Sequence, residues 1–315
     1  MISWVIGSSG LLGSAVLEEV KKHSHPWQPA RKIFWDNTGS SDSNQKSEES
    51  IKDAAKHFLS AADGRAWEIY WCAGIGVVGS DAEVLEREVK AIKFLLSCLI
   101  NDAPKTINNR KFFFASSAGG VYAGSSNPPF TEASVPVPIS DYGVQKLEIE
   151  ALLKNVGATS GIQVCIGRIA NIYGTNQNIK KQQGIVTTLV KATVLNTTVN
   201  MFVPLNTIRN YIYSTDAAYK IVNYVRDASL GYQLRIICSE QNWSLGSLLR
   251  ITKDVAKKRI HLAHSLRKET MLQPLDLRMK SLSQCDELFN QEVSLPVGVS
   301  MVREHLLRTN QNGQL

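Results

Sequence analysis

Several features that define other classes of protein are missing from this sequence. No apolar run approaches the ~20 residues that a membrane-spanning helix needs. The first predicted strand begins at residue 2, so we expect no secretory signal peptide. The 5 cysteines form neither a CxxC motif nor any other metal-ligand spacing. We therefore expect a cytoplasmic protein with reduced, mostly buried thiols, no metal site and no membrane partner.

A concentrated basic patch is missing too, although the chain is basic overall. Its 315 residues include 35 Lys and Arg against 28 Asp and Glu, a net charge of +7. The basic residues are scattered in short groups, whereas a nucleic-acid-binding protein gathers them on one face. With 43% hydrophobic residues the composition is that of a globular protein. We expect an anionic small-molecule substrate and no nucleic acid partner.

The first motif is a glycine-rich turn between an apolar strand and an amphipathic helix. Gly7, Gly10 and Gly13 form a GxxGxxG pattern that also encloses Leu11 and Leu12. The first glycine can adopt backbone angles closed to other residues, the second lets the main chain approach a pyrophosphate, and the third lets the helix pack on the strand. This context predicts a dinucleotide site with the phosphates at the helix N-terminus.

A second strand is predicted for KIFWD, which ends at Asp36, twenty-three residues after Gly13. A carboxylate there, with Asn37 beside it, can accept hydrogen bonds from the adenosine ribose and would repel the extra phosphate of NADP. Arg31 opens the strand and so lies over ~15 Å from its far end. The cofactor predicted is NAD; the alternative is that Asp36 only caps a turn with Asn37.

The following segments alternate between helix and strand. The polar residues 37–50 are expected to form a mobile surface loop, and one amphipathic helix follows before the strand WEIYWCAG, so the sheet is expected to be short at this edge. Cys72, Ala73 and Gly74 end that strand where the backbone passes close to a cofactor. A helix is predicted over residues 81–100, then a buried strand that ends in SSAGG.

Tyr142 and Lys146 lie four residues apart in SDYGVQK and therefore share one face of a predicted helix. A tyrosine alone titrates near ~10, but a fixed ammonium nearby favours the phenolate and lowers that pKa. The pair could therefore transfer protons. The same spacing also occurs by chance on solvated helices, so the interpretation depends on the surrounding motifs.

Together these motifs resemble the extended short-chain dehydrogenases, specifically the nucleotide-sugar epimerase/dehydratase family. The set comprises strand-GxxGxxG-helix, Asp36, the CAG strand end, SSAGGVY, YxxxK, GRIANIYG and RNYIYSTDAA. The resemblance implies an α/β fold with a Rossmann-type doubly wound parallel sheet that binds NAD, and a smaller C-terminal part that closes over a nucleoside diphosphate sugar. We expect the division at 1–175 and 176–315, with some later segments returning to the first part.

The resemblance also implies roles for particular residues. The catalytic group would be Tyr142, Lys146 and Ser117, which lies twenty-five residues before Tyr142. Ser116 is the alternative hydroxyl and a predicted cofactor contact. Asn171 is expected near the substrate diphosphate.

Arg209 is expected to make a charge-assisted contact with a phosphate. Where relatives commonly have an Asn in the helix after the CAG strand, this chain has Glu88. The proton relay behind the catalytic lysine is therefore expected to differ.

The reaction predicted is epimerisation at C-4 through a transient keto sugar. Dehydratases and decarboxylases of the family place an Asp or Glu after the catalytic hydroxyl, where this chain has Ala118 and Gly119. Those two activities, a reductase, and a non-catalytic dinucleotide sensor are the alternatives. A homodimer is expected through helix 81–100 and the Tyr142 helix, with Leu95, Leu96 and Leu99 as core or interface residues that sequence does not separate.

Overall fold

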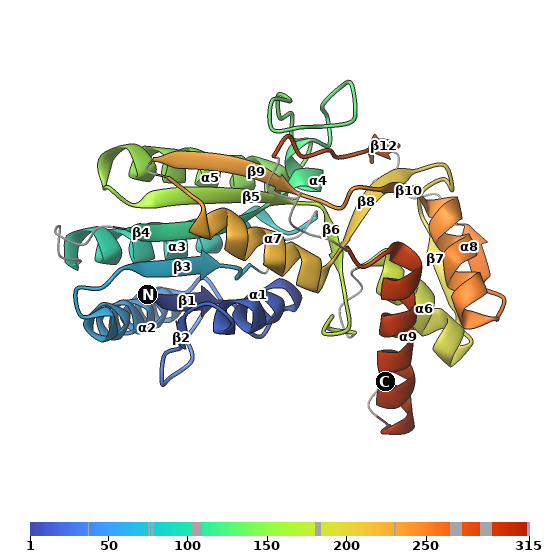
Figure 1. Ribbon diagram of the computed structural model, residues 1–315, viewed down its shortest axis with the longest axis horizontal. Helices are drawn as coiled ribbons and strands as arrows, with labels where there is room; N and C mark the ends of the chain where they lie inside the picture. The colour runs from blue at the N-terminus through green and yellow to red at the C-terminus, as the bar shows by residue number, and fades with distance from the viewer. Residues whose placement is uncertain are drawn as a thin grey trace.

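The molecule has a large lobe built around a parallel sheet and a smaller lobe of helices and short strands (Figure 1). The computed structural model describes residues 1–36, 38–74, 76, 79–102, 109–179, 184–229, 231–264, 273–283 and 292–313. Asn37 and Cys285 lie outside the described residues.

The strands in chain order are β1 Ile2–Ile6, β2 His25–Trp27, β3 Trp67–Trp71, β4 Arg110–Ser117, β5 Gln163–Ile169, β6 Asn171–Tyr173, β7 Thr198–Met201, β8 Ile208–Tyr213, β9 Tyr232–Ile237, β10 Asn242–Ser244, β11 His261–His264 and β12 Asp276–Leu277. The helices are α1 Leu11–Lys21, α2 Ser41–Ala62, α3 Ala82–Asp102, α4 Ala118–Val121, α5 Asp141–Thr159, α6 Ile185–Leu195, α7 Ser214–Arg226, α8 Leu245–Ala256 and α9 Leu295–Gln311.

In the described part of the chain, six parallel strands form the main sheet in the order β2-β1-β3-β4-β5-β9. The last strand, β9, comes from the C-terminal half and pairs with β5 from Val164↔Tyr232 to Ile169↔Ile237. Between Asp36 and Trp67 the described residues contain one helix and no strand, so β2 forms the edge. The predicted Rossmann-type α/β class is confirmed.

Helices cover both faces of this sheet because its strands are apolar on both sides. Trp4 and Ile6 of β1 point into a core shared with α2, α3 and α5, whereas Val5 points into the opposite core, shared with α1 and α7. Phe112, Phe113 and Phe114 of β4 divide between the two cores in the same alternating way.

The prediction of a strand over KIFWD is wrong. The second strand is instead β2, where Trp27 packs edge-on against Trp4 with ring centroids 5.1 Å apart and also contacts Phe58. Residues 32–36 are irregular, yet Ile33 and Trp35 still pack against the core, and Trp35 lies edge-on to Trp71. The alternation of apolar residues in this segment therefore reflects packing against the core and not pairing in the sheet.

The predicted loop over residues 37–50 is also wrong from Ser41 onward, because α2 begins there. The Ser40 side chain caps the helix by accepting a hydrogen bond from the Ser43 amide at 3.2 Å. Ser43 and Ser47 are buried on the same face as Ile51, since a small hydroxyl side chain fits where the helix lies close to its neighbours.

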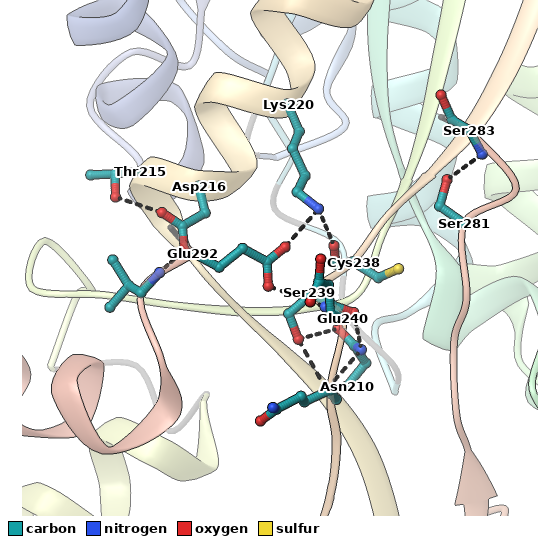
Figure 2. A network of polar contacts seen from close by, with 12 residues as sticks. Asn210, Thr215, Asp216, Lys220, Cys238, Ser239, Glu240, Ser281, Ser283 and Glu292 are labelled. Carbon is teal, nitrogen blue, oxygen red and sulfur yellow. Dashed lines mark hydrogen bonds and ion pairs between the residues drawn. The ribbon is translucent and has the colours of Figure 1, made fainter. Parts of the chain in front are cut away.

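The smaller lobe has its own apolar core among α6, α8, α9 and strands β7 and β8. A polar network ties the start of this lobe's last segment to α7 of the large lobe (Figure 2). Lys220 lies 2.7 Å from the Glu292 carboxylate and donates to the Cys238 carbonyl, while Asp216 accepts a hydrogen bond from the Val293 amide at 2.8 Å. These contacts fix the chain just before α9.

Among the described residues, no helix combines the length and apolarity needed to cross a membrane. Cys72, Cys98 and Cys165 are free thiols, and Cys98, Cys165 and Cys238 are buried.

Candidate active site

A cleft of about 1340 Å³ opens where the carboxyl ends of β1, β3, β4 and β5 meet the smaller lobe. In a parallel α/β sheet this edge is where ligands bind. The cleft is continuous from the glycine-rich turn, past Ser117 and Tyr142, to Asn171 and Arg209. A dinucleotide and a second ligand can therefore bind end to end in this cleft.

The glycine-rich turn forms one end of the cleft and has no space for a side chain at Gly7 or Gly13. Gly7 has a φ of +86°, and a Cβ on it would lie 2.6 Å from the Ala73 backbone nitrogen. A Cβ on Gly13 would collide with the Gly7 carbonyl oxygen. Gly10 caps α1 without a side-chain hydrogen bond, and the first turn has no acidic residue.

The first amides of α1 are therefore available to an anion. Leu11 and Leu12 line the cleft beside them, and Cys72, Ala73 and Gly74 form the adjoining wall. Burial raises the pKa of Cys72, so that the thiol stays neutral. The diphosphate of a dinucleotide fits this cradle.

Asp36 does not end a strand. Its carboxylate accepts hydrogen bonds from the amides of Thr38 at 3.0 Å and Gly39 at 2.9 Å, and so closes a local turn. Slight burial acts to raise the pKa of Asp36, but hydrogen bonds from Ser43, Gly39 and Thr38 outweigh it and hold that pKa below its ordinary value. The contact of Asp36 with the adenosine ribose stays a prediction.

The residue that directly follows β2 is Gln28. Its amide Nε2 donates to the Val5 carbonyl at 3.2 Å, and the Ser8 hydroxyl donates to its Oε1 at 3.5 Å. A neutral amide therefore borders the glycine-rich turn where the sequence suggested a carboxylate. Arg31 is exposed and does not open a strand, so the distance argument against it no longer holds.

Ser117, Tyr142 and Lys146 lie together in the middle of the cleft. A Cβ on Gly120 would lie 3.1 Å from two ring carbons of Tyr142 and 3.3 Å from the Ser117 hydroxyl oxygen, so both side chains lie close to this glycine. The Lys146 ammonium lies 5.4 Å from the centre of the Tyr142 ring. Ser140 caps α5 and so fixes where this helix begins.

Ser116 lines the cleft, but its hydroxyl is engaged elsewhere. It donates to Glu150 Oε1 at 2.6 Å, and Glu150 also pairs with Arg168, which donates to the Tyr122 hydroxyl. All four residues are buried. The Ser117 hydroxyl accepts a bond from the Gly120 amide at 3.2 Å and remains able to donate, so the geometry favours Ser117 over Ser116 as the reactive hydroxyl.

The far end of the cleft carries the predicted substrate residues. Asn171 is exposed and donates its side-chain amide to the Asn210 carbonyl at 2.9 Å. Arg209 donates to the carbonyl of Ile208, and burial lowers its pKa, with the charges of Tyr211 and Asp276 acting in the opposite direction. The contact of Arg209 with a phosphate stays a prediction.

Sequence reasoning missed Lys191 and Tyr211. Lys191 projects from α6 into the cleft, where its ammonium donates to the Ile179 carbonyl at 3.3 Å. A lysine inside the apolar stretch IVTTLVKATVL is the signal that could have identified it. Tyr211 of β8 is buried together with its neighbours Asn210 and Ile212, and burial raises its pKa to about 12.

The charges that line the cleft have one sign. The described lining residues include the cations Lys146, Lys191 and Arg209 but no Asp, Glu or His. Such a site attracts an anionic ligand. It also offers no described carboxylate or imidazole as a second proton-transfer group.

A glycine-rich dinucleotide cradle beside a Ser, Tyr and Lys group at the switch point of a parallel sheet defines a dinucleotide-dependent enzyme of the Rossmann class. Residues 4–234 match the model of the NAD dependent epimerase/dehydratase family. The chain therefore belongs to this family, and its cofactor is NAD, as the sequence predicted.

Two curated relatives match parts of the chain. A Methanocaldococcus jannaschii protein with a provisional UDP-glucose 4-epimerase name is 32% identical over 108 residues, 34% of this chain and 35% of that protein. The dTDP-4-dehydro-6-deoxyglucose reductase of Escherichia coli is 29% identical over 136 residues, 43% of this chain and 41% of that enzyme. The matches thus span well under half the length of either relative.

A solved structure resembles the whole chain. The UDP-glucose 4-epimerase of Thermotoga maritima with UDP-glucose has a TM-score of 0.74 and 21% identity, with 98% of this chain and 100% of that chain covered. At this identity the likeness shows the fold.

Proposed function

We propose that this protein is an NAD-dependent epimerase that inverts C-4 of a nucleoside diphosphate sugar. The observation that carries the proposal is the single cleft in which Ser117, Tyr142 and Lys146 lie between a dinucleotide cradle and a cationic far end, with no carboxylate among its described lining residues.

Tyr142 acts as the proton acceptor for the sugar C-4 hydroxyl, and Ser117 donates a hydrogen bond that orients the same oxygen. The Lys146 ammonium stabilises the phenolate because an opposite charge nearby favours the ionised form. NAD held at the glycine-rich turn of Gly7, Gly10 and Gly13 would supply reversible hydride transfer at C-4, so that a keto sugar that turns in the cleft would be reduced on its opposite face. Tyr142 then gives its proton back to the C-4 oxygen.

Arg209, Lys191 and Asn171 hold the diphosphate, so binding energy far from the reacting carbon keeps the sugar in range while it turns. An elimination or decarboxylation would call for a further acid or base, which the described lining residues do not supply. This supports epimerisation over the dehydratase and decarboxylase alternatives. The presence of both Tyr142 and Lys146 in the cleft likewise argues against a non-catalytic sensor.

A second candidate is the reduction of a keto sugar nucleotide by a cofactor that dissociates after each turnover. Two observations favour it: Gln28, and not a carboxylate, follows β2, and the E. coli relative is named as a reductase. Both candidates use the same Tyr, Ser and Lys group, and they differ in whether the hydride stays on the enzyme.

The test is incubation of the purified protein with UDP-, dTDP-, GDP- and CDP-sugars, without added reductant. A thermal-shift screen first selects the nucleotide, since a ligand at 100 times its Kd stabilises by roughly 2.7 kcal/mol. The C-4 epimer should then form to equilibrium with no accumulation of free NADH. A product that forms only when reduced cofactor is consumed stoichiometrically would favour the reductase.

A further inference from the structure

Glu88 is a buried carboxylate directly behind the proposed proton-transfer group. It lies on α3 with 8% of its surface exposed, and its Oε1 is 2.8 Å from the Lys146 ammonium. Gln145 donates to the other oxygen, Oε2, at 3.3 Å. A Cβ on Gly74 would lie 3.3 Å from both oxygens, so the carboxylate rests against the cofactor-side wall and does not itself line the cleft.

We propose that Glu88 is a positioning residue that holds the Lys146 ammonium and offsets its charge, so that Tyr142 becomes a base only when oxidised cofactor is bound. This inference rests on the proton-transfer role of Tyr142 in the proposed function. It assigns to Glu88 a control over when that proton is accepted.

The surroundings of the pair support a charge effect. The Lys146 ammonium lies 5.0 Å from the Phe114 ring centre and 5.4 Å from the Tyr142 ring centre. Among the described contacts of Glu88 and Lys146, the titratable groups are each other and Tyr142; Gln145, Gly74 and Phe114 complete the shell without charge.

An ammonium near a phenol favours the phenolate, but a carboxylate in contact with that ammonium weakens its field at the phenol. Because Glu88 weakens the field of Lys146 at the phenol, the positive charge of a bound oxidised nicotinamide would supply the rest of the stabilisation that the Tyr142 phenolate needs. Hydride transfer to the cofactor would remove that charge, so Tyr142 would keep the proton that it has accepted. Keeping the proton on Tyr142 until the hydride returns suits a reaction in which the proton must go back to the same oxygen.

The test follows the near-ultraviolet difference absorbance of tyrosinate as pH is raised, with Tyr142 isolated by subtracting the matched Tyr142→Phe protein. In the cofactor-free Glu88→Gln variant, the Tyr142 signal should appear at least about 1 pH unit lower than in the native chain. Added NAD should shift the native signal downward by more than it shifts the signal of the variant. Glu86→Gln, an exposed change on the same helix, serves as the control and should titrate like the native chain.

Equal titration of Tyr142 in the native and Glu88→Gln proteins overturns the proposal, and so does an equal response to NAD. If Glu88→Gln does not fold, Glu88→Asp weakens the contact with Lys146 and should shift the signal in the same direction by less; no shift again overturns it. A shift of the Tyr142 signal in a protein without epimerase activity would support the Glu88 proposal and contradict the proposed reaction. Epimerase activity without a shift of that signal would support the reaction and contradict the Glu88 proposal.

Discussion

Tyr142 is the residue on which the proposed proton transfer depends. Replacing it with phenylalanine keeps the ring that packs beside Gly120 and Gly76 but removes the acidic hydroxyl. We expect Tyr142→Phe to lower kcat by at least ~10², the lower end for loss of a general base, with nucleotide binding nearly unchanged.

Steady-state kinetics and a nucleotide titration measure the two effects of Tyr142→Phe separately. Tyr232→Phe, which removes a phenol outside the cleft, is the control. A Tyr142→Phe protein with native kcat would contradict the assignment.

Lys191 is expected to act on binding and not on chemistry. It lines the far end of the cleft and contacts a carbonyl, so its charge remains available to a phosphate. Hydrogen bonds to charged groups contribute about 1.5–3 kcal/mol, and Lys191→Met should therefore raise the substrate KM about tenfold or more while kcat changes little. Lys253→Met, at an exposed position of α8, should change neither, and a loss confined to kcat would exclude the binding role.

At the scale of elements, the parallel sheet and the helices that follow Gly10 and Ser140 could be predicted because each has a strong local pattern. The edge strand could not be predicted, because both KIFWD and HPWQ are short segments that could pair with β1. Which of them pairs depends on the contacts of Trp27 with Trp4 and Phe58, which are distant in sequence. Helix α2 was missed at its start because its buried positions are serines.

The candidate site divides in the same way. Ser117, Tyr142 and Lys146 follow from sequence spacing, whereas the contact of Glu88 with Lys146 joins residues 58 positions apart and depends on how α3 packs against α5. The partner of the Ser116 hydroxyl, Glu150, is likewise visible only in the folded chain.

The stability that the contact between Asp216 of α7 and Val293 contributes should depend on pH. Burial raises the pKa of Asp216 above 3.8, with the Val293 amide acting in the opposite direction. In the window between 3.8 and that raised value the folded chain binds a proton that the unfolded chain has released, so the contribution of Asp216 to stability falls as pH rises.

The isosteric variant Asp216→Asn keeps an acceptor for the Val293 amide and removes the buried charge. We expect it to have the higher Tm at neutral pH, and the difference from the native chain should narrow as pH falls below the raised value. Thermal denaturation measured over a pH series checks this. A difference that widens on acidification would show that the charge stabilises the link.

At the scale of the whole molecule, we propose a homodimer through α3 and α5, as the family resemblance implied. Leu95, Leu96 and Leu99 are buried within the chain's own core, so the interface would use the outer surface of these helices, which includes the exposed Val144 and the Lys93–Glu148 pair. Light scattering at micromolar concentration should give twice the mass of one chain. A purely monomeric mass rules the dimer out.

The whole molecule places one dinucleotide cradle and one cationic anchor at opposite ends of a single cleft, and the central claim is that a hydride leaves C-4 of the sugar and returns to it. The most direct measurement uses a nucleotide sugar labelled with deuterium at C-4, followed by mass spectrometry and NMR of the product. The C-4 epimer should form with the deuterium retained at C-4, without added reductant and without uptake of hydrogen from solvent. Loss of the label to solvent or to free cofactor, or a product that lacks the C-4 hydroxyl, would contradict the account.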